Sequence, residues 1–430
     1  MIDLKVKRDQ ATLFRKQGRF DKAIPLFEEL WNETKDKWDG WGLANCLCKT
    51  KDFEKALNIS KEVYKADTDF NLIRATYTWS AYMLHIKDFG TDDNYETLKS
   101  YGSGILKLSE SNHEDMFRQL TVQKIMEFCE NKGMWDAVVA WSGKINGGIL
   151  NNQPYEMKSN GKNITIPSNR EKFFLKITKA YEKLEKWSDC LEKSCEALEH
   201  FPDIIWFQRR KAISEGHIGN IEQAIEDLTK ISLVKSDWFI FRDIAVFYAK
   251  NGNIDKALDF IIEGCIASAK QPDPGYRWEL YYNAALFLQK SGDTQMAKKH
   301  LLLSFSLRNN EGWKTKEVIS TLASEMDLVL EGITNTNNLL QELKQFWEKH
   351  KFANLPKHAG KIKTMLPNGK AGFITSNDKK DFYFKVFSFN GNKKIIKNGL
   401  EVEFFVQESF DKSKNKKSYQ AVNISASNHG

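Results

Sequence analysis

The sequence of 430 residues lacks any long apolar run. No stretch approaches the roughly 18–20 consecutive apolar residues that a membrane-spanning helix requires. The first eight residues, Met1–Arg8, mix apolar with charged side chains and lack the continuous apolar centre of a secretory signal. These absences exclude a helical membrane protein, so we expect no membrane partner and a cytoplasmic location.

Metal-binding and nucleotide-binding motifs are also missing. The six cysteines, at positions 46, 48, 129, 190, 195 and 265, have no zinc-site spacing. We expect them to be buried free thiols in a reducing compartment. No glycine-rich phosphate loop is present, and the eight histidines are scattered. The sequence therefore predicts no catalytic residues, no metal, no cofactor and no enzyme.

Positive charge is concentrated at the C-terminal end of the chain. Residues 357–430 contain fourteen Lys, no Arg and six Asp or Glu, a net charge of +8. Because the whole chain has a net charge of +7, the preceding residues are close to neutral. A polyanion-binding role is therefore expected in the tail. The basic run Arg209-Arg210-Lys211 favours a solvated helix face over a phosphate clamp.

An internal repeat with a period near 34 residues runs through the rest of the chain. Each unit has a turn, then an apolar residue, then a small residue three positions later. The apolar residue is expected to fill the angle between two helices, and the small one to let them approach closely. The apolar residues are Phe20, Phe53, Trp187, Ile221 and Ile254, and the small ones are Ala23, Ala56, Cys190, Ala224 and Ala257.

These units resemble the tetratricopeptide repeat family, most clearly over residues 8–66 and 172–305. The resemblance implies stacked helical hairpins that form an α-solenoid, about seven to nine in number, with a groove for an unidentified protein partner. We divide this part into an N-terminal sub-array at 1–143, a loop insertion at 144–170, and a second sub-array with closing helices at 171–350.

The tail predicts a small sheet. Residues 360–363, 370–374 and 381–385 alternate with a period of two, which is typical of short strands. Lysines and aromatic residues are interleaved on one side of these strands. Rings can stack on unpaired bases while ammonium groups contact phosphates, so this pattern favours a single-stranded nucleic acid.

The tail resembles a cold-shock domain, a five-stranded oligonucleotide-binding (OB) barrel. The matching segments, in the order of the family, are Gly360–Lys363, Gly372–Ile374, Asp381–Lys385, Gly399–Phe404 and Gln420–Ile424. The resemblance implies a barrel over residues 357–427 whose outward face binds single-stranded RNA, or less favourably DNA.

Strand alternation assigns the candidate site. With Ile362, Ile374 and Phe384 pointing inward, Phe373 and Tyr383 point outward and are the expected stacking residues. The residues expected to contact the nucleic-acid backbone are Lys361, Lys363, Lys370 and Lys385. The remaining phenylalanines of the tail are expected to pack in the core or in loops; they are Phe387, Phe389, Phe404 and Phe405.

Three positions depart from the cold-shock pattern. Thr364 stands where the family has Trp, Ala371 where it has an aromatic residue, and Lys385 where it has His. Ala371 is expected to face outward with Phe373. Because lysines replace part of the stacking platform, we expect weaker, more electrostatic and less base-selective binding.

The sequence as a whole predicts a mainly α protein: a tetratricopeptide-like α-solenoid followed by a small β-barrel. We interpret it as an RNA-binding adaptor whose repeats dock a protein partner. One alternative is a non-catalytic scaffold whose barrel no longer binds nucleic acid. Another is that the groove of the repeats binds nucleic acid together with the barrel.

Overall fold

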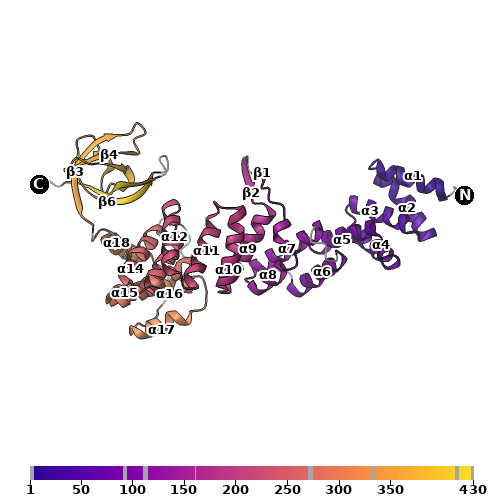
Figure 1. Ribbon diagram of the computed structural model, residues 1–430, viewed down its shortest axis with the longest axis horizontal. Helices are drawn as coiled ribbons and strands as arrows, with labels where there is room; N and C mark the ends of the chain where they lie inside the picture. The colour runs from indigo at the N-terminus through magenta and orange to yellow at the C-terminus, as the bar shows by residue number, and fades with distance from the viewer. Residues whose placement is uncertain are drawn as a thin grey trace. The chain divides into compact units, whose positions relative to one another are not determined.

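The computed structural model describes residues 4–90, 94–109, 115–159, 161–269, 275–331, 336–353, 355–411 and 416–427. The chain forms two compact units, Met1–Lys211 and Ala212–Gly430. Both are built mainly from helices that follow one another along the chain, and the second unit also contains a closed β-barrel (Figure 1). The fold class predicted from the sequence, a tetratricopeptide-like solenoid with a C-terminal barrel, is confirmed.

The first unit contains ten complete helices among the described residues, and α11 (Ile205–His217) crosses its boundary. The ten are α1 (Leu4–Lys16), α2 (Phe20–Thr34), α3 (Lys37–Lys49), α4 (Phe53–Ala66), α5 (Asn71–His85), α6 (Tyr95–Leu108), α7 (Met116–Asn131), α8 (Trp135–Ser142), α9 (Asn169–Lys183) and α10 (Trp187–His200). One apolar cluster joins α1–α5 and a second joins α5–α11. Helices are thus present between residues 70 and 143, where the repeat signature is weak.

The repeat residues occupy the positions that their spacing predicts. Each apolar residue after a turn is the first residue of a helix, as Phe20 is of α2 and Ile254 is of α14 (Ile254–Ser268). All five small residues are fully buried. Gly292 ends its helix in the left-handed conformation, with φ of 92°, which glycine adopts without steric cost.

The strands β1 (Tyr155–Ser159) and β2 (Lys162–Ile166) form a β-hairpin that projects from the first unit beside α9 (Figure 1). It lies within residues 144–170, which the sequence predicted only as a loop insertion, after the short 3₁₀ turn η1 (Gly147–Ile149). Tyr155 and Met157 share one face of the ribbon with Ile164, and all three side chains are exposed. Strands that are exposed on both faces lack the buried side that makes alternation visible in a sequence.

The basic run at residues 209–211 is neither a solvated face nor a phosphate clamp, which corrects the sequence-based interpretation. Arg209 and Arg210 are buried, and each donates a hydrogen bond of 2.9 Å to the carboxylate of Glu182 on α9. Burial alone would raise the pKa of Glu182, but the two guanidinium groups outweigh it and lower that pKa to about 2. The hydrogen bonds of Arg209 and Arg210 to Glu182 therefore hold α11 against α9.

The second unit contains seven complete helices in the part of the chain that the structure describes. They are α12 (Ile221–Val234), α13 (Trp238–Lys250), α14 (Ile254–Ser268), α15 (Trp278–Ser291), α16 (Thr294–Asn310), α17 (Glu317–Glu325) and α18 (Asn337–Ala353), with the 3₁₀ turn η2 (Gly275–Arg277) before α15. The closing helices predicted at the end of residues 171–350 are present as α17 and α18. Helix α18 packs against α14 and α16 and buries Leu343 and Trp347 in their shared core.

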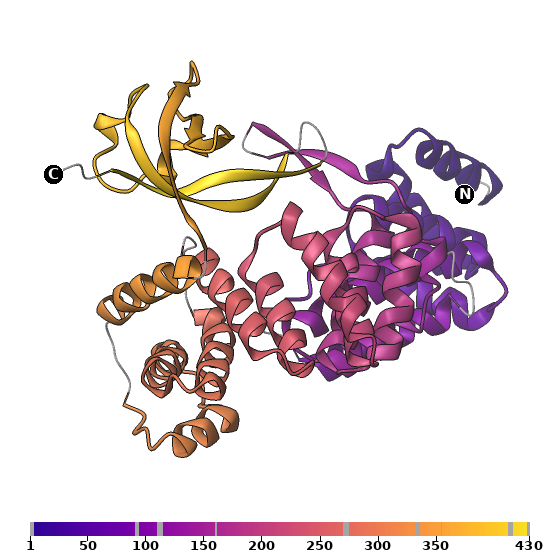
Figure 2. The ribbon, with the colours of Figure 1, turned by 60° about the vertical axis from the view of Figure 1, so that its left-hand side comes forward.

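Five strands close into a barrel in the order β3-β4-β5-β7-β6, with β6 returning to β3. They are β3 (Lys357–Met365), β4 (Ala371–Ser376), β5 (Asp381–Lys385), β6 (Glu401–Asp411) and β7 (Lys416–Ala426), with the 3₁₀ turns η3 (Val386–Ser388) and η4 (Lys393–Ile395) after β5. All neighbours are antiparallel except β5 and β7. Strands β6 and β7 form the long yellow ribbon in Figure 2.

The barrel core contains the residues that alternation places inward. Ile362, Ile374 and Phe384 are at most 1% exposed, as are Val402 and Phe404 on β6. A Cβ atom at Gly360 would lie 2.4 Å from the carbonyl oxygen of Thr375 on β4. Only glycine therefore allows β3 and β4 to approach this closely.

Candidate nucleic-acid interface on the barrel

A row of paired residues crosses the outer face of the barrel. Strand register aligns one residue from each strand in the order Thr364, Phe373, Tyr383, Gln420 and Gln407. Phe373 and Tyr383 are half-buried, and their ring centroids lie 5.8 Å apart with the planes at 70°. The two predicted stacking residues are therefore adjacent on one face, with part of each ring open to solvent.

Two of the four predicted backbone-contacting lysines form ion pairs within the barrel. Lys361 Nζ lies 2.9 Å from a carboxylate oxygen of Glu401, and Lys363 Nζ lies 2.5 Å from Asp381. The hydrogen bond from Lys363, helped by one from Thr375, lowers the pKa of Asp381. A phosphate would have to compete with these carboxylates, so the two lysines contribute less than their charge suggests.

The other two lysines lie at the end of β4 and β5 that is farther from Asp381. Lys385 pairs in register with Ala371, and Lys370 immediately precedes Ala371. Both side chains are exposed, and within the described residues no carboxylate pairs with either of them. Lys385 Nζ lies 5.6 Å from the ring centroid of Phe387. This end of the barrel therefore combines unpaired positive charge with an aromatic ring.

Two aromatic residues on the surface were not predicted from the sequence. Phe387 was expected to pack in the core or a loop, but it is 67% exposed. It lies in η3 directly after β5, where strand alternation no longer assigns a face. Tyr419 on β7 is 60% exposed and opposes Glu408. Its neighbours Ser418 and Gln420 are polar, and strand alternation then predicts that residue 419 faces inward, so no sequence signal indicated exposure.

The other expectations for the tail have mixed outcomes. Phe389 and Phe404 are buried as predicted, and Phe405 stacks on Phe352 at the end of α18, with centroids 4.9 Å apart. Ala371 was expected to face outward but is only 4% exposed, so this position offers no open surface. The tail also contains a lysine-rich run at 412–417, of which residues 412–415 lie outside the described residues.

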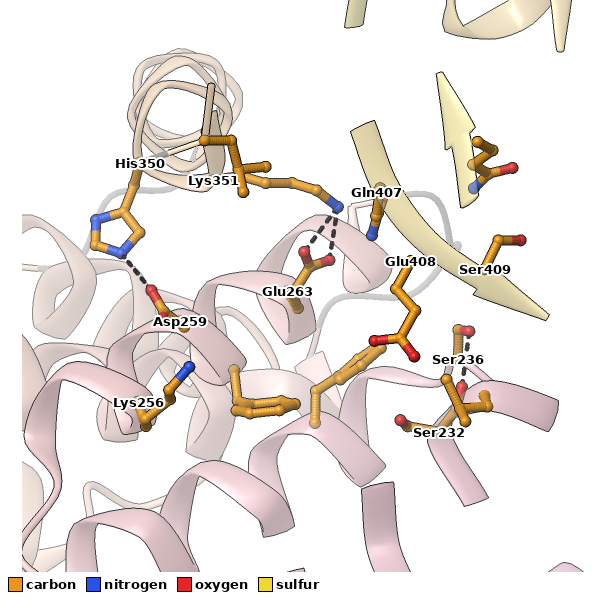
Figure 3. A pocket seen from close by; sticks show the side chains of 15 residues that line it. Ser232, Ser236, Lys256, Asp259, Glu263, His350, Lys351, Gln407, Glu408 and Ser409 are labelled. Atoms are coloured by element: carbon orange, nitrogen blue, oxygen red, sulfur yellow. Dashed lines mark hydrogen bonds and ion pairs between the residues drawn. The ribbon is translucent and has the colours of Figure 1, made fainter. Parts of the chain in front are cut away.

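The same row of residues continues into a cleft within the second unit. This cavity of about 600 Å³ lies between β6 and β7 on one side and α12, α14 and α18 on the other (Figure 3). Gln407 and Glu408 project into it from β6, while Lys351 on α18 reaches Glu263 on α14 at 2.8 Å (Figure 3). A second cavity of similar size shares Gln407 and Gln420 and extends to Lys385 and Phe387.

Metal-ligating side chains do not gather in the described part of the chain. No cluster of three or more His, Cys, Asp or Glu residues could hold a metal ion there. None of the six cysteines, which all lie in the described residues, forms a disulfide; five are buried as expected, whereas Cys195 is exposed. Burial raises the pKa of Cys46 and Cys129 to about 11, so these thiols stay protonated near neutral pH. Among the described helices, none combines the length and apolar character needed to cross a bilayer.

The helical part matches models of a known repeat family. The tetratricopeptide repeat family matches at residues 14–77 and again at 279–311. Both units contain tetratricopeptide repeats. Arrays of such repeats present extended surfaces to other proteins, which indicates a protein–protein interaction scaffold.

Similar helical-repeat structures are known. YrrB, described as a TPR protein with an unusual peptide-binding site, is 14% identical; the match covers 57% of this chain and 93% of YrrB, with a TM-score of 0.28. MamA is 15% identical, with 45% and 93% covered and a TM-score of 0.32. A tetratricopeptide repeat protein from Parabacteroides merdae ATCC 43184 is 11% identical, with 75% and 98% covered and a TM-score of 0.33. A search of curated proteins gave no match.

Proposed function

We propose that this protein is an RNA-binding adaptor: its repeats dock a protein partner and its barrel binds single-stranded nucleic acid. The observation that carries this proposal is the adjacent pair Phe373 and Tyr383 on β4 and β5. These are the second and third strands of a five-stranded barrel, and in OB folds the face of those two strands binds oligonucleotides. Each ring that stacks on a base is worth roughly 1–3 kcal/mol.

The charges around this pair support a bound polyanion. Lys370, Lys385 and the exposed ring of Phe387 lie at one end of the two strands. Bases stacked on the aromatic pair would place their phosphates within reach of these lysines. RNA is preferred over DNA because its 2′-hydroxyl can both donate and accept hydrogen bonds on a polar face such as this one.

A tether to a protein scaffold makes a modest affinity useful. If the repeats hold a protein that is already bound to an RNA, the barrel meets that RNA at high effective concentration. The ion pairs of Lys361 and Lys363 fit a barrel of moderate intrinsic affinity. The same ion pairs favour the second candidate, a scaffold whose barrel no longer binds nucleic acid.

Fluorescence anisotropy of a labelled single-stranded RNA over a salt series tests the proposal. The full chain should bind, and the slope of log K against the logarithm of the salt concentration should be about −0.7 for each phosphate neutralised. Phe373→Ala with Tyr383→Ala should weaken binding by at least tenfold, since two stacking contacts are lost. Tyr419→Ala, an exposed aromatic residue outside the aligned row, is the matched control and should change affinity less than twofold (about 0.4 kcal/mol).

The outcomes separate the candidates. Loss of binding in the double variant with an unchanged far-UV spectrum supports the adaptor. No binding by the intact chain contradicts it and leaves the scaffold. Binding that both variants retain would place the nucleic acid elsewhere, as in the alternative that the repeat groove takes part.

A further inference from the structure

The row that carries the aromatic pair ends in two side-chain amides. Tyr383 is in register with Gln420 on β7, and Gln420 is in register with Gln407 on β6. Paired residues on neighbouring strands lie about 5 Å apart and point to the same face. A nucleic acid that stacks on Tyr383 therefore places its next base beside these amides.

Both amides are available for a ligand. Gln407 and Gln420 are half-buried, and no residue in the described ranges hydrogen-bonds to either side chain. Both line the two cavities between the barrel and the helices. A partly desolvated amide without a partner gains more from a ligand hydrogen bond than one fully in water.

The charge of the cleft argues against a phosphate there. The cavity in Figure 3 is lined by two lysines, Lys256 and Lys351, and three carboxylates, Asp259, Glu263 and Glu408. Glu263 is paired with Lys351, and Glu408 with Lys417 at 2.7 Å. Once Lys417 is counted, three lysines balance three carboxylates, so the lining offers no excess of positive charge for a phosphate and suits an uncharged group better.

The walls of the cleft suit a flat ring. Phe241 and Phe260 line the cavity opposite the barrel strands, so an inserted ring would lie among aromatic side chains and amides. A cavity of about 600 Å³ lies within the range of about 300–1,000 Å³ of small-ligand sites. Lys385, one of the lysines that can contact phosphates, lines the second cavity together with the two glutamines, so the backbone beside an inserted base still meets a positive charge.

We propose that this cleft binds one adenine base of the single-stranded nucleic acid, read by the amides of Gln407 and Gln420. A glutamine amide offers a donor and an acceptor that match N7 and N6 of adenine in a bidentate pair. This inference rests on the proposed function and adds base selectivity to it. It departs from the expectation, drawn from the missing aromatic residues, that binding is less base-selective.

The test compares two labelled RNAs of about twelve nucleotides, within the site size of one OB fold. One is oligouridine, and the other is the same strand with a single central adenosine. The full chain should bind the adenosine-containing strand about tenfold more tightly, as expected for one bidentate pair. Gln407→Ala with Gln420→Ala should bind both strands equally, with affinity for oligouridine unchanged. Gln223→Ala, on the surface of α12, is the matched control and should keep the preference.

Each outcome decides the inference. A preference that disappears only in the double glutamine variant, with thermal unfolding unchanged, supports it. Equal binding of both strands by the unmodified chain, with binding lost in the Phe373→Ala, Tyr383→Ala variant, overturns the adenine site and leaves the proposed function standing. A preference that survives in the glutamine variant also overturns it. Failure of the unmodified chain to bind either strand overturns the proposed function and this inference together.

Discussion

The indole Nε1 of Trp347 donates a hydrogen bond of 2.8 Å to Nε2 of His300, and both side chains are buried. On the other side of the ring, Nδ1 lies 2.8 Å from the carbonyl oxygen of Met296. Trp347 also stacks on Tyr281, with ring centroids 5.9 Å apart. The imidazole therefore has to be neutral, with its proton on Nδ1, to join α18 to α16.

This arrangement predicts an acid-sensitive second unit. Burial lowers the pKa of His300 from 6.5 to about 4. Between these values the unfolded chain binds a proton that the folded chain does not, so stability falls as the pH is lowered. The expected contribution is roughly 1.4 kcal/mol per pH unit, with none above the unfolded value. Urea unfolding followed by tryptophan fluorescence across this pH range measures it.

His300→Gln is the control for this pH dependence. A glutamine can accept the hydrogen bond of Trp347 but cannot titrate. The variant should therefore show a shallower loss of stability than the unmodified chain below about pH 6.5. Parallel pH profiles for the two proteins would show that His300 does not titrate in the way described.

The buried cluster of Glu182, Arg209 and Arg210 predicts a large stability effect in the first unit. Glu182→Gln removes the charge that balances two guanidinium groups. Removal of one partner from a buried ion pair costs about 3–5 kcal/mol, so the melting temperature should fall strongly. Glu192→Gln on α10 is the control, because the Glu192 side chain is 72% exposed, and it should change stability by less than about 0.5 kcal/mol. Equal effects of the two substitutions would contradict the importance of the cluster.

Lys51 offers a stabilising substitution. It occupies the turn between α3 and α4 with φ of 66°, a left-handed conformation that costs a non-glycine residue about 1–2 kcal/mol. Lys51→Gly relieves this strain. The greater freedom of glycine in the unfolded chain offsets part of the gain, so we expect a net stabilisation of about 0.5–1 kcal/mol. Lys61→Gly, at an exposed position inside α4, should instead destabilise it by about 1 kcal/mol. Denaturant unfolding of both variants measures the difference, and a loss of stability in Lys51→Gly would contradict the prediction.

The ion pair between Lys363 and Asp381 predicts a gain in nucleic-acid binding. In the unmodified chain, Thr375 donates a hydrogen bond of 2.6 Å to Asp381. Asp381→Asn removes the carboxylate that competes for Lys363 but keeps an oxygen that can accept this hydrogen bond. If the freed ammonium contacts one more phosphate, the slope of log K against log salt should steepen by about 0.7. Asp378→Asn, in the turn between β4 and β5, is the control. An unchanged slope in Asp381→Asn would show that Lys363 does not lie on the path of the backbone.

The sequence predicts most of the repeat architecture because its signals are local. A residue such as Ala224 must be small wherever two helices of one hairpin meet, so its spacing alone reveals the hairpin. The barrel strands are predicted for the same reason, since Ile362 and Phe384 follow the alternation of their own strands. In both cases the residue that carries the signal is close in sequence to the structure that it specifies.

The failures of prediction depend on partners that are distant in sequence. Arg209 and Arg210 read as a solvated run because their partner, Glu182, belongs to an earlier repeat. Lys361 and Lys363 read as free charges because Glu401 and Asp381 oppose them only once the strand register is known. The two glutamines of the cleft carry no signal at all until β5, β7 and β6 are aligned.

Helix α18 also links the barrel to two successive hairpins. It packs against α14 and α16, the second helices of neighbouring hairpins, and Phe352 near its end is stacked on Phe405 of β6. A repeat inserted before α18 would alter the surface on which this helix lies and the point at which β3 begins. Such an insertion would therefore disturb the seating of the barrel as well as the stacking of the hairpins.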